Sequence, residues 1–228
     1  MRVTAYDFET TGPVPANCEP LQLGIMDVTI HENGDYTVNS YLDQLMTIKA
    51  DEVPEGAYRV HGINKGMTVG SNCPRTLISS NLNNVTVLGY NNTSFDDTIA
   101  KRYGAHIANS IDMFTAARRM KSEGVIEKAT LSGAYTALTG EEPENAHDAL
   151  SDVKMTLALI KPVMAHYKFE TFSELVTFLQ TFKADVNLKM PFGKHKGIAL
   201  KDLPKSYVQW AKKNMSLTGE LKASFDLL

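Results

Sequence analysis

The chain has 228 residues, of which 43% are hydrophobic and 21% charged, enough for one sizeable core and a small appendage. It contains no apolar run of about 18 residues, which excludes a transmembrane helix of ordinary length, and its first residues follow a strand pattern where a signal peptide would need a long apolar stretch. Cys18 and Cys73 lack the spacing of a zinc site or a disulfide framework, so we expect a reducing, cytoplasmic setting.

The formal net charge of −3 is unevenly distributed. Residues 183–228 carry nine Lys against four Asp or Glu, whereas residues 1–182 carry 14 Lys or Arg against 22 Asp or Glu. An acidic body with a basic tail indicates a metal site in the body and a polyanion-binding surface in the tail. A solvated lysine-rich surface is the alternative for the tail.

Hydrophobic periodicity and turn residues predict a mixed α/β sheet, with an antiparallel meander followed by strands that alternate with helices. In chain order we expect strands at residues 2–8, 21–30 and 36–45, a helix at 75–82, a strand at 85–89, a helix at 95–103, a strand ending at residue 112, a helix through residues 118–121, and helices at 130–138 and 148–166.

A capping box at residues 171–174 then opens a helix with an apolar stripe of Leu175, Phe178, Leu179 and Phe182, which we interpret as packing surface. After residue 183 the composition becomes glycine- and lysine-rich, with two short helical patterns near 207–213 and 219–227. We therefore predict a catalytic domain at 1–168, a connection at 169–188 and a small basic module at 189–228.

Three segments carry candidate catalytic residues. Asp7 and Glu9 lie in the segment Asp-Phe-Glu-Thr-Thr-Gly of residues 7–12 and, being two apart on a strand, point the same way. They end an apolar strand, where a buried face would not tolerate unpaired carboxylates. Asp96 stands in the first turn of a predicted helix, where a purely structural acid is also common. Asp112 is better explained as a helix cap, and we leave it outside the site.

The third segment contains His147 and Asp152. Five residues span about 140° of helix rotation, whereas Asp148 and Asp152 share a face, so spacing alone leaves the two pairings open. If the helix begins near Asp148, His147 lies on the preceding loop and Asp152 projects from the second turn. Carboxylates in this arrangement suit a paired magnesium or manganese centre that cleaves phosphodiesters.

Together the three segments resemble the Exo I, Exo II and Exo III motifs of the DEDDh 3′–5′ exonucleases. The first motif matches in full, the third keeps its His and Asp, and the second has Asn91 in place of the usual histidine while it keeps Asp96. The resemblance covers residues 7–152 and implies a ribonuclease H-like mixed five-stranded sheet flanked by helices. Residues 61–63, His-Gly-Ile, also resemble the family's segment near the terminal nucleotide.

The resemblance implies a function and a set of roles. Asp7, Glu9, Asp96 and Asp152 would hold two Mg²⁺ ions, which Mn²⁺ can replace, and His147 would act as general base. The reaction would release 5′-mononucleotides from the 3′ end of DNA, single-stranded or duplex, in a setting such as DNA repair. The residues bordering the terminal nucleotide would be Thr10, Thr11, His61, Ile63 and Asn92.

Residues 192–197 and 207–210 resemble the C-terminal segment of exodeoxyribonuclease X, which favours DNA as the substrate. Lys194 and Lys196 are the leading candidates there for phosphate contacts, with Lys201, Lys205, Lys212 and Lys213 beside them. Tyr207 and Trp210 stand three apart and would either stack on bases or pack in the module's core, which is our expectation for Trp210. An exoribonuclease, a non-catalytic nucleic-acid-binding module, and either a monomer or a homodimer remain open alternatives.

Overall fold

The computed structural model describes residues 1–181, 185–215, 217 and 219–228. The chain divides into two compact units, Met1–Val176 and Thr177–Leu228. The division falls inside helix α9 (Phe172–Gln180), within the segment 169–188 that the sequence assigns to a connection. Residues 182–184 of that segment, including Phe182 of the apolar stripe, lie outside the described residues. The separation into a catalytic and a basic domain stays a prediction.

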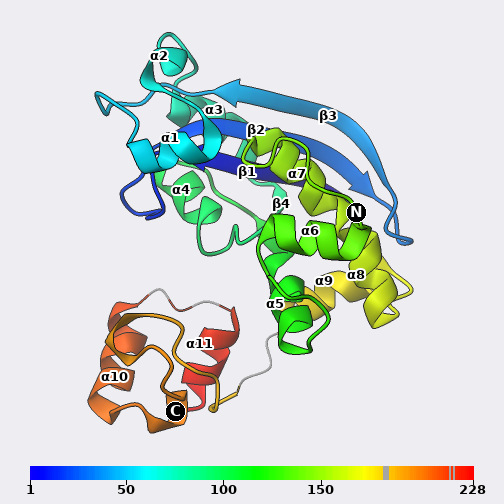
Figure 1. The fold of residues 1–228 in the computed structure, drawn as a ribbon, viewed down its shortest axis with the longest axis vertical. Coiled ribbons are helices and arrows are strands. Elements are labelled where there is room, and N and C mark those ends of the chain that lie inside the picture. Colours follow the sequence, from blue (N-terminus) through cyan, green and yellow to red (C-terminus); the bar gives the residue numbers. More distant parts are fainter. Residues whose placement is uncertain (182–184, 216, 218) are drawn as a thin grey trace. The chain divides into compact units, whose positions relative to one another are not determined.

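The first unit is built on a five-stranded sheet (Figure 1). Its spatial order is β3 (Tyr36–Leu45), β2 (Pro20–Ile30), β1 (Arg2–Thr10), β4 (Thr86–Gly89) and β5 (Asn109–Asp112). The pairs β1–β2 and β2–β3 are antiparallel, whereas β1–β4 and β4–β5 are parallel. This mixed sheet confirms the predicted fold class.

The helices of this unit are α1 (Glu55–His61), α2 (Lys65–Thr68), α3 (Pro74–Leu82), α4 (Asp96–Arg102), α5 (Phe114–Ser122), α6 (Leu131–Thr139), α7 (Ala149–Ala158) and α8 (Ile160–Tyr167), before α9. The single helix expected at 148–166 is wrong, because the chain forms α7 and α8 with a break at Leu159. Pro162 explains the break, since it has no N–H to bond the carbonyl of Ala158 and its ring would clash there. Over the described ranges no helix is both long and apolar enough to cross a bilayer.

The two faces of β1 have different environments. Tyr6 and Phe8 belong to a buried apolar cluster that also contains Ile78 of α3 and Ile99 of α4. Helix α7 packs across β1 and β2. Because side chains alternate along a strand, Asp7 and Glu9 leave β1 on the face opposite Tyr6 and Phe8.

Helix α7 can approach the sheet closely because β2 has a glycine at the contact. Gly24 pairs with Asp7 across the β1–β2 ladder. A Cβ atom built at Gly24 would lie 2.4 Å from the carbonyl carbon of Ala149, the first residue of α7. The start of α7 therefore rests directly on the strand backbone next to Asp7.

The second unit has its own small core, formed by Met190, Leu200, Leu203, Val208, Ala211 and Phe225. It contains two short 3₁₀ segments, Gly193–His195 and Leu200–Asp202, and the helices α10 (Lys205–Asn214) and α11 (Gly219–Asp226). Trp210 does not join this core. Its exposed fraction is 52%, so the expectation that it packs inside the module is wrong.

We predict that Gly24→Ala lowers the free energy of unfolding by about 1–3 kcal/mol, the usual cost of an overpacked contact. The added methyl group would meet backbone atoms of α7, which cannot move without displacing the helix. Gly56→Ala in α1 is the matched control, because a Cβ there meets nothing within 4 Å and alanine favours helix. Urea unfolding of both variants measures the effect; equal stability of Gly24→Ala and its parent would contradict the close-contact argument.

Candidate active site

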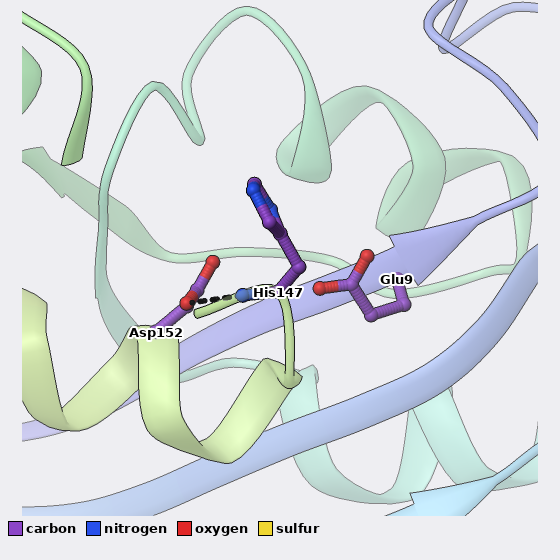
Figure 2. Close-up of side chains that lie close together, drawn as sticks. All are labelled: Glu9, His147 and Asp152. Carbon is purple, nitrogen blue, oxygen red and sulfur yellow. Dashed lines mark hydrogen bonds between the residues drawn. The ribbon is translucent and has the colours of Figure 1, made fainter. Parts of the chain in front are cut away.

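Three of the predicted site residues lie close together at one end of β1 (Figure 2). Glu9 comes from β1, Asp152 from the first turn of α7, and His147 from the loop that precedes α7. One ligand atom of each residue lies within 4.8 Å of the others. Residues separated by more than a hundred positions in the sequence thus meet in one place.

The loop places His147 through its own backbone. His147 has a φ of +68°, in the left-handed region that few side chains adopt without cost. Its backbone N–H donates a hydrogen bond to Oδ1 of Asp152 at 3.2 Å. The ring remains exposed beside Glu9 and Asp152. This resolves the spacing problem in the sequence, because His147 lies before the helix and Asp152 within it.

Asp7 and Asp96 complete the cluster of carboxylates. The backbone N–H of Phe8 donates to Oδ1 of Asp96 at 3.3 Å, which fixes the start of α4 against β1. Burial raises the pKa of Asp7 well above its usual range, and the charges of Asp96, Asp152 and Glu9 raise it further. The pKa of Asp96 is also well above its usual range, through burial and the charge of Asp97, against the hydrogen bond from Phe8. The structure therefore brings all four predicted acids into one electrostatic group.

The two acids nearest His147 are also perturbed. Burial, followed by the charges of Asp152 and Asp148, raises the pKa of Glu9 to about 8. Burial raises the pKa of Asp152 to about 6, although the N–H and charge of His147 partly oppose this. Such carboxylates hold protons near neutral pH unless a cation stabilises their charged forms.

Gln22 holds the start of α7, although no local sequence pattern marks it. Gln22 pairs with Glu9 across the ladder and is buried. Its amide donates to Oδ2 of Asp148 at 2.9 Å, and its Oε1 accepts from the N–H of Ala149 at 3.3 Å. Asp148 also caps α7 by accepting from the N–H of Ser151 at 3.0 Å. Burial alone would raise the pKa of Asp148, but the hydrogen bonds from Gln22 and Ser151 leave it lowered.

A buried network of hydrogen bonds is centred on Asp97, the residue that follows Asp96. Tyr6 donates its hydroxyl to Oδ1 of Asp97 at 2.6 Å, and Nδ2 of Asn92 donates to the same oxygen at 3.3 Å and to Ser110 at 2.8 Å. Asn92 is fully buried. The prediction that Asn92 contacts the substrate is therefore wrong, because its side chain is enclosed within the fold and serves this network.

The residues predicted to border the nucleotide lie beside the cluster. His61 accepts from the N–H of Ile63 at Nδ1, 3.0 Å away, so its Nε2–H donates to the carbonyl of Thr10 at 3.2 Å. Burial lowers the pKa of His61, the hydrogen bond to the carbonyl of Thr10 opposes this, and nearby His147 lowers it further. Thr10 donates its hydroxyl to Gly12, and Thr11 accepts from the N–H of Glu19. Both threonines thus shape the turn after β1, while Ile63 is buried in an apolar cluster.

The remaining candidates lie elsewhere. Asp112 accepts hydrogen bonds from the backbone of Asn91 and Phe114 and from the hydroxyl of Thr93, so it is a structural acid, but the N-cap of α5 is Met113 and not Asp112 as expected. Lys194 and Lys196 are exposed residues of the second unit. Their contact with nucleic acid stays a prediction.

The acidic group fits a divalent cation. Oxygen-rich ligand sets suit Mg²⁺ and Mn²⁺, and ligand atoms within 4.8 Å of one another are close to the spacing around one such ion, with bonds of about 2.1 Å. The raised pKa values of Glu9 and Asp7 point the same way, because burial first and the neighbouring carboxylates second disfavour their charged forms, which a bound cation would stabilise. The cluster can therefore exchange its protons for metal ions.

Comparison with known families agrees with this geometry. A family model described as "Exonuclease", of the ribonuclease T type, matches residues 4–160. The chain therefore belongs to this exonuclease family, whose members are enzymes that hydrolyse phosphodiester bonds. Residues 179–227 match a second family model, described as "Putative quorum-sensing-regulated virulence factor". The general resemblance seen in the sequence is confirmed, whereas the closer one to exodeoxyribonuclease X stays a prediction.

Among individual proteins, the chain is similar to exodeoxyribonuclease I of Escherichia coli strain K12, with 26% identity over 229 aligned residues. The alignment covers 87% of this chain but only 44% of that protein, so the chain spans less than half of its relative.

Solved structures share the fold. The zinc-bound form of an E. coli exonuclease I complex with single-stranded DNA has a TM-score of 0.62 at 22% identity, covering 77% of this chain and 43% of that one. A complex of E. coli exonuclease I with a dT13 oligonucleotide has a TM-score of 0.58 at 21% identity, covering 73% and 42%.

We predict that the metal-free protein becomes less stable as the pH rises from about 5 to about 8. The folded state keeps a proton on Glu9 up to a pKa of about 8, whereas the unfolded chain loses it near the ordinary value of 4.5. Between these values the folded state binds more protons, so the free energy of unfolding falls as pH rises. Thermal unfolding in EDTA across this range measures the slope.

Glu9→Gln should flatten this slope and weaken the stabilisation that Mg²⁺ confers at about pH 8. Glu52→Gln, at an exposed position, is the matched control. A slope that Glu9→Gln leaves unchanged would show that the cluster does not titrate as described.

Proposed function

We propose that the chain is a 3′–5′ exonuclease that hydrolyses DNA to 5′-mononucleotides, with two Mg²⁺ ions bound by Asp7, Glu9, Asp96 and Asp152 and with His147 as general base. The observation that carries this proposal is the convergence of Glu9, Asp152 and His147, with ligand atoms within 4.8 Å of one another, in a chain of the exonuclease family. Mn²⁺ would replace Mg²⁺, since both prefer oxygen ligands.

When bound, the two cations would lower the pKa of a coordinated water and neutralise the charge that develops on the phosphate. The four carboxylates hold the site for them from three separate elements: β1 supplies Asp7 and Glu9, α4 supplies Asp96, and α7 supplies Asp152. Each element is fixed by contacts outside the site, so the carboxylates stay together in spite of their mutual repulsion.

His147 would accept the proton of the attacking water. Its backbone N–H is bonded to Asp152, which keeps the residue at the metal site, while its ring is exposed and free to exchange the proton with solvent. An imidazole titrates near working pH, as a general base requires. His61 is unsuited to this role, because Ile63 and Thr10 already engage both of its ring nitrogens.

His61 would instead position the end of β1. Its bond to the carbonyl of Thr10 fixes the backbone directly after Glu9. Thr10 and Thr11 hold the following turn, and its backbone would meet the terminal nucleotide. Phosphate and sugar contacts of this kind read no base sequence, so we expect little sequence preference.

The choice of DNA is supported by the relatives. The similar protein of E. coli is an exodeoxyribonuclease, and the similar solved structures contain single-stranded DNA. The resemblance of residues 192–197 to the tail of exodeoxyribonuclease X supports the same substrate. RNA is the alternative that the assay must test.

Product analysis on 5′-labelled single-stranded and duplex DNA, and on matched RNA, tests the proposal. We expect stepwise shortening from the 3′ end of DNA with Mg²⁺, release of 5′-mononucleotides, and no reaction in EDTA. Faster degradation of RNA would make the chain an exoribonuclease, and undiminished hydrolysis in EDTA would refute the metal mechanism.

We predict that His147→Ala lowers kcat by about 10²–10⁴-fold, the usual contribution of a general base, while Mg²⁺ still stabilises the fold. The ring of His147 is exposed, so its removal leaves the core intact. His106→Ala is the matched control, because His106 is also exposed but lies outside the site. Single-turnover hydrolysis measures the effect; a His147→Ala rate equal to that of the control would eliminate the general-base role.

A further inference from the structure

The second unit has a hollow of about 580 Å³ beside its core, since Tyr207 and Met215 line the hollow and also pack against that core. Its lining includes Phe192, Lys194, His195, Tyr207 and Trp210. Tyr207 also packs against the apolar core of this unit, whereas Phe192 and Trp210 are not among the residues that form that core or pack against it. The volume falls within the range of about 300–1,000 Å³ that is typical of ligand sites.

The aromatic rings of the hollow form a connected platform. Tyr207 and Trp210 project from one side of α10, with ring centroids 5.7 Å apart and planes only 28° from parallel. The ring of His195 lies 4.3 Å from that of Tyr207. Trp210 is 52% exposed and Phe192 is 46% exposed, so large apolar surfaces face the solvent. Rings arranged in this way offer stacking faces to a flat ligand.

The charge around the platform is positive. The ammonium of Lys194 lies 5.7 Å from the centre of the Tyr207 ring. Lys205, Lys212 and Lys213 are exposed positions of α10, and Lys196 is exposed as well. Residues 183–228 carry nine Lys against four Asp or Glu, a balance of +5. Flat aromatic surfaces next to lysines match the bases and phosphates of a single strand.

We propose that this hollow is a second nucleic-acid site, in which Tyr207 and Trp210 stack on a base of single-stranded DNA while Lys194 and its neighbours contact the adjoining phosphates. The site would add affinity without chemistry, since the residues described as lining the hollow include neither Asp nor Glu. This inference rests on the proposed function for the identity of the strand. A proline-rich peptide also binds aromatic grooves but would not require the excess of lysines.

Trp210 is the chain's single tryptophan, so its fluorescence reports on this hollow alone. The test uses the full chain in EDTA, which prevents hydrolysis, with oligothymidylate, a matched abasic oligomer and a proline-rich peptide as probes. We expect oligothymidylate to quench Trp210 in a salt-dependent way and the abasic oligomer to quench it far less. A bound oligothymidylate, detected by anisotropy, that leaves Trp210 fluorescence unchanged would overturn the proposal, as would quenching by the peptide alone.

Variants sharpen the test. Trp210→Ala should weaken oligothymidylate binding about tenfold, within the range measured for the loss of one base–aromatic stack, whereas Trp210→Phe should keep most of the affinity. Lys194→Gln should reduce the slope of log affinity against log salt by about one. Leu227→Ala, a change at another exposed apolar position of this unit, is the matched control. Equal affinities of Trp210→Ala and Leu227→Ala would contradict the stacking role.

The proposed exonuclease activity and the proposed binding site in the second unit can be refuted independently of each other. Quenching by oligothymidylate in a protein that hydrolyses no nucleic acid with Mg²⁺ would refute the exonuclease and keep the binding site. Hydrolysis of DNA with an unresponsive Trp210 would keep the exonuclease and refute the site.

Discussion

The repulsion among four carboxylates is the constraint on which the rest of this structure depends. Asp7, Glu9, Asp96 and Asp152 are gathered where burial already disfavours negative charge, and nearby carboxylates raise the pKa of each further. A polypeptide free to relax would separate them. They stay together because the sheet and two helices are fixed by contacts elsewhere, so the fold stores an unfavourable electrostatic energy that protons or cations can relieve. If these four side chains hold metal ions as proposed, their repulsion lowers the stability of the metal-free protein and favours binding of the cation.

The position of α7 determines whether that cluster exists. Gly24 allows the start of the helix to rest on β2, and Gln22 bonds both the capping residue Asp148 and the first helical N–H. Gly24 and Gln22 lie opposite Asp7 and Glu9 in the ladder. Strand β1, which carries two of the acids, is therefore paired directly with β2, on which α7 packs. The start of α7 positions Asp152 directly. It positions His147 through the hydrogen bond that the backbone N–H of His147 donates to Asp152. A change in the packing of α7 would thus move a candidate ligand and the candidate base together.

Most of the fold and the four acids could be predicted from the sequence, because strand alternation, turn residues and the motif segments are local signals. The sheet order required long-range pairing that the family resemblance supplied. Gln22 was missed because its partners at the start of α7 lie more than a hundred residues away, and no local pattern marks it. Gly24 did carry a signal, since an isolated glycine in an apolar strand often marks a close approach. The break near Pro162 could also have been predicted from the sequence. The burial of Asn92 and the exposure of Trp210 could not, because they depend on packing that periodicity does not specify.

The candidate site of the first unit is negatively charged, whereas the second unit is positively charged. The two sets of charges respond differently to ionic strength. Of the four clustered carboxylates in the first unit, Glu9 and Asp96 are buried and Asp7 and Asp152 are half-buried, so added salt screens them less than it screens exposed charges. The lysines of the second unit are exposed, so their attraction to phosphates weakens steeply as salt rises. The net charge of −3 hides this difference, because it sums an acidic first part of the chain and a basic second part.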